Sequence, residues 1–118
     1  MQFLVVGHDG DDPSAPERRL AARPAHLALG DRLRDEGRLL YAAALLDGKD
    51  AMVGSVLICE FADRAELDAW LGAEPYVAGG VWKRIEVTPC RVAPSFASRL
   101  RPFSGPALRR RQTQRRKR

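Results

Sequence analysis

Residues 53–61 constrain this chain most, because apolar side chains occupy both faces of the strand that they predict. Successive side chains of a strand point to opposite faces of a sheet. One face would carry Val53, Leu57, Cys59 and Phe61, and the other Val56 and Ile58. The helices of a small domain can cover only one of these faces. We therefore predict that a second copy of the chain covers the other, in a homodimer.

The predicted elements follow the order strand, helix, strand, strand, helix, strand. They cover residues 3–6, 24–36, 39–46, 53–61 and 63–72, with a last strand around Ile85 and Val87. Alternation and apolar runs mark the strands, and repeats at i, i+3 and i+4 mark the helices. A polar loop is expected before Pro24, because proline commonly opens a helix at its first turn. This order predicts an α+β fold of the ferredoxin-like type, a four-stranded antiparallel sheet with both helices on one face.

The basic residues are concentrated at the end of the chain. Residues 1–90 hold all 15 acidic side chains and 10 of the 20 basic ones, which gives a net charge of −5. Residues 91–118 hold the other 10 basic residues and no acid, which gives +10. We predict one domain at 1–90 and a disordered basic tail at 91–118. The tail could bind nucleic acid weakly and without sequence preference, or it could be only a solvated appendage.

Several classes of function are disfavoured by what the sequence lacks. It has no apolar run of the roughly 18–20 residues that a membrane span needs and no signal peptide, so we expect a cytoplasmic protein without membrane contact. Cys59 and Cys90 lack the spacing of zinc or redox sites and are expected to be buried thiols. No metal-ligand cluster and no glycine-rich phosphate loop is present, so no metal or cofactor is expected.

Two short segments carry the candidate chemistry, residues 23–27 (RPAHL) and residues 74–77 (EPYV). His26 shares the helical spacing of Leu29 and Leu33, so its imidazole should face the sheet. Glu74 precedes a proline, which favours an extended backbone at that residue. A neutral imidazole held by a carboxylate can act as a general base near neutral pH. The alternative is a partly buried histidine with one structural hydrogen bond and a glutamate that caps the following turn.

Several motifs together resemble the YciI-like (YCII-related) family of dimeric α+β barrels, over roughly residues 2–89. They are Asp9-Gly10, the RPAHL segment, residues 36–39 (EGRL), Gly54-Ser55, Pro75-Tyr76-Val77 with Gly80, and Pro89. The resemblance implies a ferredoxin-like protomer with a His and Asp active site, and a few relatives act on small cyclic or halogenated organic compounds. This chain has Glu74 where the family usually has Asp. It also has Ala43 and Ala44 where a Gly-Pro pair usually ends the second strand.

From the residues and the resemblance together, His26 and Glu74 are the predicted catalytic residues, and Arg23, Tyr76 and Ser55 the predicted substrate-binding ones. Arg23 could equally pair with a carboxylate, and Tyr76 could anchor the turn. Ser55 has no nucleophile signature and is typical of a spacer inside a strand.

The predicted function is a small enzyme that isomerises, eliminates from or hydrolyses a small organic molecule. The alternatives are a non-catalytic module that binds a small ligand or has a regulatory role, and nucleic-acid association through the tail.

Overall fold

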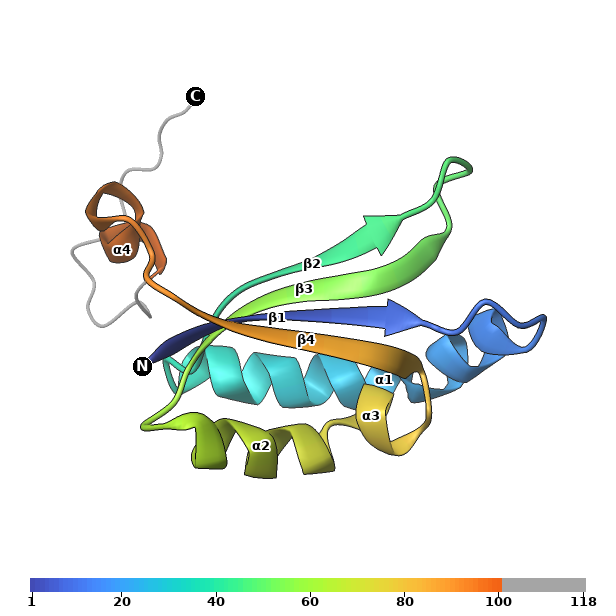
Figure 1. The fold of residues 1–118 in the computed structure, drawn as a ribbon, viewed down its shortest axis with the longest axis horizontal. Coiled ribbons are helices and arrows are strands. Elements are labelled where there is room, and N and C mark those ends of the chain that lie inside the picture. Colours follow the sequence, from blue (N-terminus) through green and yellow to red (C-terminus); the bar gives the residue numbers. More distant parts are fainter. Residues whose placement is uncertain (101–118) are drawn as a thin grey trace.

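The computed structural model describes residues 1–100 and has the predicted α+β architecture (Figure 1). In chain order the elements are β1 (Gln2–Asp9), α1 (Ala15–Asp35), β2 (Leu39–Leu46), β3 (Met52–Glu60), α2 (Arg64–Ala73), α3 (Pro75–Ala78), β4 (Trp82–Cys90) and α4 (Pro94–Leu100). No helix among the described residues is long and apolar enough to cross a membrane.

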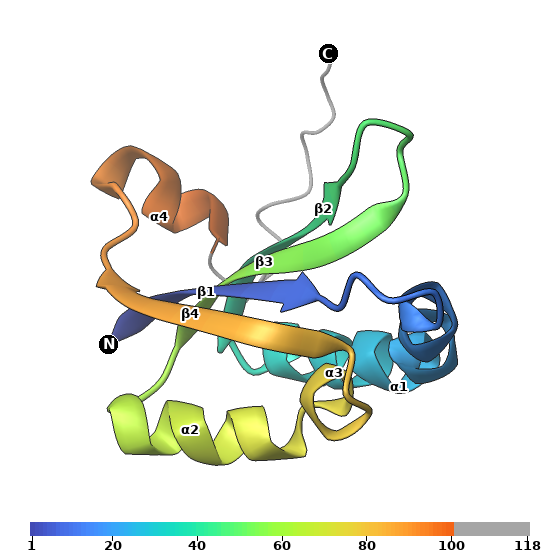
Figure 2. The ribbon, with the colours of Figure 1, turned by 45° about the vertical axis from the view of Figure 1, so that its right-hand side comes forward.

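The four strands form one antiparallel sheet in the order β2-β3-β1-β4. Helices α1 and α2 lie side by side beneath one face, with the single turn of α3 between α2 and β4 (Figures 1 and 2). This is the strand order that the strand–helix–strand repeat of the ferredoxin-like fold produces. Helix α1 links β1 to β2, α2 and α3 link β3 to β4, and β2 and β3 form a hairpin. The predicted fold class is confirmed.

Helix α1 starts nine residues earlier than the sequence predicts, at Ala15 rather than at Pro24. The prediction of a polar loop there was wrong. Pro16 occupies the first turn and supplies the favourable proline start, whereas Pro24 lies inside the helix. A proline inside a helix leaves the carbonyl four residues earlier, here that of Leu20, without its usual donor. Both Leu20 and Pro24 are exposed, so water can satisfy that carbonyl.

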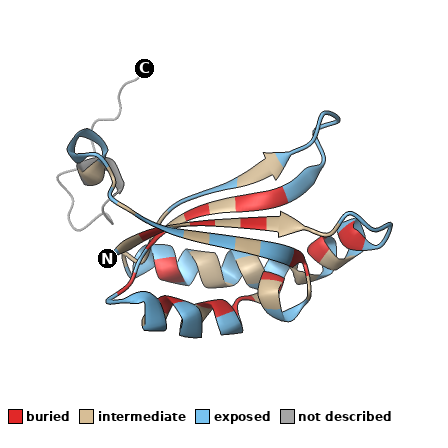
Figure 3. Cartoon of the chain, viewed as in Figure 1, coloured by how far each residue is buried: buried red, intermediate tan, exposed pale blue. Residues whose placement is uncertain are grey.

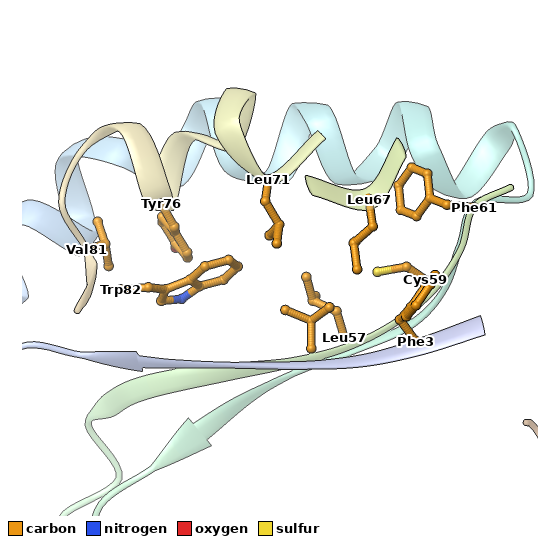
Figure 4. Close-up of a cluster of buried hydrophobic side chains, with 10 residues drawn as sticks. Phe3, Leu57, Cys59, Phe61, Leu67, Leu71, Tyr76, Val81 and Trp82 are labelled. Carbon is orange, nitrogen blue, oxygen red and sulfur yellow. The ribbon is translucent and has the colours of Figure 1, made fainter. Parts of the chain in front are cut away.

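The core lies between the sheet and the helices, and alternation along the strands builds it. Odd-numbered residues of β1 and β3 point toward the helices, where Leu67 and Leu71 of α2 meet them (Figure 4). The buried apolar cluster consists of Phe3, Val5, Leu57, Cys59, Phe61, Leu67, Leu71, Tyr76, Val81 and Trp82. Val53 is the exception to the predicted pattern, since it is 41% exposed near the start of β3. Buried segments alternate with more exposed ones along the strands and helices (Figure 3).

The two cysteines are free thiols. Cys59 is buried, and this burial raises the pKa of its thiol to about 12. A thiol with so high a pKa carries almost no thiolate at neutral pH and is a poor nucleophile or metal ligand. The expected buried position is thus observed for Cys59, whereas Cys90 is only half-buried.

Helix α2 is capped as the sequence indicates. The Asp63 side chain accepts a hydrogen bond from the Glu66 N–H at 2.8 Å, and the Glu66 carboxylate accepts one from the Ala62 N–H at 2.8 Å. The predicted stop at Gly72 was wrong by one residue, since the helix continues to Ala73. Proline at position 75 then begins α3, so Glu74 is the joint between two helices.

The face of the sheet away from α1 and α2 carries a second set of apolar side chains. Leu4 and Val6 of β1 lie beside Ile58 and Val56 of β3, and all four are only half-buried. Helix α4 lies on this side of the sheet, where the sequence predicts no element (Figures 1 and 2). The division into a domain at 1–90 and a disordered tail stays a prediction. Residues 101–118, which hold most of the basic tail, lie outside the described residues.

Candidate active site

His26 and Glu74 are in direct contact although 48 residues separate them in the sequence. His26 Nδ1 lies 2.5 Å from Glu74 Oε1. The Glu74 side chain is 1% exposed and that of His26 is 16% exposed. The middle of α1 presents the imidazole, and the joint between α2 and α3 presents the carboxylate.

The backbone at Glu74 explains why its carboxylate is available to the histidine. Glu74 is extended, with φ −66° and ψ 125°, as expected for a residue before proline. Its Oε1 accepts a second hydrogen bond, at 3.0 Å, from the N–H of Tyr76, and so caps α3. Because a carboxylate oxygen accepts from both groups, Nδ1 of the imidazole carries the hydrogen. In the neutral ring Nε2 then holds the lone pair.

Two aromatic rings pack against the imidazole. The ring of Tyr76 stacks on it with centroids 3.7 Å apart and planes 9° apart. Trp82 meets His26 edge-on, with centroids 6.0 Å apart, and meets Tyr76 in the same manner at 5.6 Å. Burial raises the pKa of the Tyr76 hydroxyl, so this group keeps its proton at neutral pH. The rings restrict the histidine to one orientation.

A buried ion pair, Asp9 with Arg19, completes the surroundings. Arg19 Nη1 donates to both carboxylate oxygens of Asp9, at 2.9 and 3.0 Å. Its Nη2 donates to the Gly54 carbonyl at 3.2 Å and to Ser55 Oγ at 3.1 Å. The guanidinium carbon also lies 4.8 Å from the centroid of the Tyr76 ring, within range of a cation–π contact.

Arg19 is not among the site residues predicted from the sequence, and Asp9 was predicted there only as part of a family motif. The missed signal is helical spacing, since Arg19 precedes His26 by seven residues and thus shares its face of α1. That spacing was hidden because the helix was predicted to begin only at Pro24.

The predicted binding residues line a pocket of about 280 Å³ between α1 and the β2–β3 hairpin. The hairpin rises away from α1 toward its tip (Figure 1). The polar residues that line it are Arg19, Arg23, His26, Ser55 and Tyr76. The apolar walls come from Leu27, Ala42, Ala43, Ala44, Met52 and Leu57. A second hollow of about 320 Å³ adjoins it along α1 and is also lined by His26, and by Glu74.

Of the three predicted binding residues, Ser55 and Tyr76 are buried and Arg23 lies exposed at the rim. Within residues 1–100, no carboxylate pairs with Arg23. The structure therefore brings together all five residues predicted for the site. Among the same residues, no group of three or more His, Cys, Asp or Glu side chains could hold a metal ion.

Comparison with known proteins agrees with the fold and the motifs. The YCII-related domain matches residues 1–91. The protein YciI of Escherichia coli O6:H1 is 41% identical over an alignment of 93 residues, and the match covers 74% of this chain and 95% of that protein. An uncharacterized protein of Haemophilus influenzae is 34% identical over an alignment of 95 residues, and the match covers 75% of this chain and 95% of that protein.

One solved structure is similar over most of the fold. It is the 5-chloro-2-hydroxyhydroquinone dehydrochlorinase TftG of Burkholderia phenoliruptrix AC1100, in complex with 2,5-dihydroxybenzoquinone. It is 25% identical with a TM-score of 0.68, and the match covers 80% of this chain and 98% of that one. The resemblance noted from the motifs is confirmed, and the chain belongs to the YCII-related domain family.

Proposed function

We propose that this protein is an acid–base enzyme that isomerises, eliminates from or hydrolyses a small organic molecule. His26 Nε2 takes a proton from the substrate, and Glu74 holds the imidazole in the required orientation. The substrate occupies the pocket between α1 and the β2–β3 hairpin. A cytoplasmic location stays a prediction.

One observation carries the proposal, the 2.5 Å contact between His26 Nδ1 and the buried Glu74 carboxylate. It commits one ring nitrogen to the protein and leaves the other free for a ligand, as general-base catalysis requires. The imidazolium formed by proton transfer is stabilised by the same carboxylate. The similarity to a dehydrochlorinase supports an elimination, in which a base removes a proton and chloride leaves.

The test is chloride release from 5-chloro-2-hydroxyhydroquinone by the wild-type chain and three variants. His26→Asn should lower turnover at least ~100-fold, because general-base catalysis contributes about 10²–10⁴-fold. Glu74→Gln should lower it by roughly tenfold, since an amide holds the ring but does not stabilise the imidazolium. His8→Asn is the matched control, because His8 is the other histidine and pairs with Glu86 at 3.0 Å outside the pocket. Its turnover should equal that of the wild type.

Equal losses in His26→Asn and His8→Asn would contradict the proposed role of His26. If the wild-type chain bound the chlorinated compound without releasing chloride, and also failed to exchange its ring protons with solvent deuterium, the non-catalytic binding module would take its place. The non-catalytic module would bind its ligand through the same pocket residues, because the pocket exists whether or not turnover occurs.

We also propose that the chain is a homodimer through the sheet face opposite α1 and α2. On this face Leu4, Val6, Val56 and Ile58 form a continuous apolar patch across β1 and β3. Tyr41 of β2 lies next to Ile58 and is 58% exposed. Burying such a patch against its own copy is the common solution for a small domain.

Sedimentation equilibrium of the full chain should give twice the 13.1 kDa chain mass. Ile58→Asp should shift the mass to that of a single chain at micromolar concentration, since it would bury a charge in the interface. Leu20→Asp is the control, because Leu20 is 73% exposed on α1 and lies away from this face. A wild-type monomer, or an Ile58→Asp protein that remains dimeric, would show that this face is not the interface.

A further inference from the structure

The hydroxyl group of Ser55 is surrounded by hydrogen-bond donors. Its Oγ accepts from Arg19 Nη2 at 3.1 Å and from Trp82 Nε1 at 3.3 Å. A guanidinium and an indole N–H can only donate. A serine oxygen has two acceptor positions and one hydrogen, so both acceptor positions are occupied and only the hydrogen remains.

That hydrogen has no acceptor within the described part of the chain. Among residues 1–100, Ser55 donates no hydrogen bond, although Ser55 is only 3% exposed. Ser55 lines the same pocket as His26 and Tyr76. A buried donor without an acceptor is costly, and a ligand oxygen in the pocket would relieve that cost.

The charges around the pocket indicate which kind of oxygen fits. The charge of Arg19 is balanced by Asp9 at 2.9 Å, so Arg19 acts on Ser55 by position rather than by net charge. Arg23 at the rim has no carboxylate partner among residues 1–100 and adds a positive charge. Tyr76 lines the same pocket, and its hydroxyl keeps its proton because burial raises its pKa. The polar groups that face the ligand are thus mainly donors.

We propose that Ser55 is a dedicated hydrogen-bond donor to an anionic oxygen of the ligand, a phenolate or an enolate, and that Arg19 and Trp82 are the positioning residues that prevent it from accepting. This rests on the proposed function in one respect, that the pocket binds a small organic molecule. The role of Ser55 adds to the proposed function the class of ligand, a molecule with an anionic oxygen. A hydrogen-bond donor at this position suits removal of a proton from the carbon next to a carbonyl group, because that step places a negative charge on the carbonyl oxygen.

In that step the C–H bond breaks and its proton moves to His26 Nε2. The electron pair of the bond forms a carbon–carbon double bond, and the carbonyl electrons move onto oxygen to give an enolate. The Ser55 O–H donates to this oxygen, and such a bond to a charged acceptor is roughly twice as strong as one to a neutral acceptor. A donor already in place stabilises the developing charge without reorganisation.

The test compares two probes that differ by one anionic oxygen, 4-nitrophenolate and nitrobenzene, at alkaline pH. Dissociation constants are measured for the full chain by absorbance and by NMR. The wild type should bind the phenolate more tightly than nitrobenzene. Ser55→Ala should weaken phenolate binding about tenfold and change nitrobenzene binding less than about twofold. Ser14→Ala is the matched control, since Ser14 is exposed and its side chain makes no cap hydrogen bond.

A second variant, Trp82→Phe, keeps Ser55 and frees one of its acceptor positions. The hydroxyl can then rotate, so phenolate affinity should fall about threefold while nitrobenzene affinity is retained. It also serves if Ser55→Ala fails to fold. A wild type without preference for the phenolate, equal losses for both probes, or no loss in either variant would overturn the proposal.

The outcome is separable from that of the proposed function. His26→Asn keeps Ser55, Arg19 and Trp82, so its preference for the phenolate should persist. A wild-type chain that prefers the phenolate but releases no chloride would reject the acid–base enzyme alone. Chloride release with no preference for the phenolate would reject the role of Ser55 alone.

Discussion

Gly7→Ala is expected to destabilise the domain by about 3 kcal/mol, because the added methyl group overlaps the indole of Trp82. A Cβ at position 7 would lie 2.4 Å from the nearest ring carbon of Trp82 and within 2.6 Å of two more. Gly7 of β1 is paired with Ser55 on one side and with Ile85 on the other, so its backbone cannot move away. The indole is 5% exposed and cannot move outward without breaking the core.

The measurement is thermal unfolding followed by circular dichroism, with an expected fall in Tm of roughly 15 °C for a domain of this size. Gly72→Ala is the matched control. Gly72 lies inside α2, is exposed, and would have nothing within 4 Å of a new Cβ. This variant should raise stability by about 0.5–1 kcal/mol, since alanine is the better helix former. A Gly7→Ala protein as stable as the wild type would mean that Trp82 does not pack against β1.

Glu74→Ala is expected to cost about 3 kcal/mol of folding free energy, because one buried and one partly buried donor lose their acceptor. The Tyr76 N–H and His26 Nδ1 both donate to Glu74 Oε1, at 3.0 and 2.5 Å. An unsatisfied buried donor costs about 1–3 kcal/mol, and the removed side chain leaves a cavity at the joint of α2 and α3. The expected fall in Tm is again about 15 °C.

Glu74→Gln separates the hydrogen bonds from the charge. The amide oxygen can accept from both donors, so this variant should lose only about 1 kcal/mol. Chemical denaturation of the two variants gives the comparison. Equal stability of Glu74→Ala and the wild type would show that the carboxylate does not cap α3 and that the contact with His26 contributes nothing to the fold.

Local sequence patterns were sufficient for most of the fold. The alternation in β3 predicts which side chains share a face of the sheet, because side-chain direction in a strand depends on the parity of the position. The Asp63 and Glu66 spacing predicts the start of α2, because a capping box forms within one turn. The extended backbone of Glu74 follows from its proline neighbour. Each of these depends on residues close together in the chain.

The start of α1 shows where a local rule fails. Proline at position 24 has a strong preference for the first turn of a helix. The helix nevertheless begins nine residues earlier, at Ala15, and Ala15 and Arg19 in this added segment are buried. The contacts of Arg19 with Asp9, Gly54 and Ser55 offset the missing hydrogen bond at Pro24. Helix propensity is a weak prior, and tertiary contacts override it.

For the site, the sequence by itself determined which chemical groups are available, the imidazole of His26 and the carboxylate of Glu74. Each lies in a short segment in which a proline restricts the backbone. Only the tertiary structure decided that Nδ1 meets Glu74, that Arg19 and Asp9 pair beneath the pocket, and that the Ser55 hydroxyl is left with a hydrogen to donate. These contacts join four elements across the register of β1 with β3 and the docking of α1. Such register and docking arise from the packing of the whole core, so no local spacing encodes them.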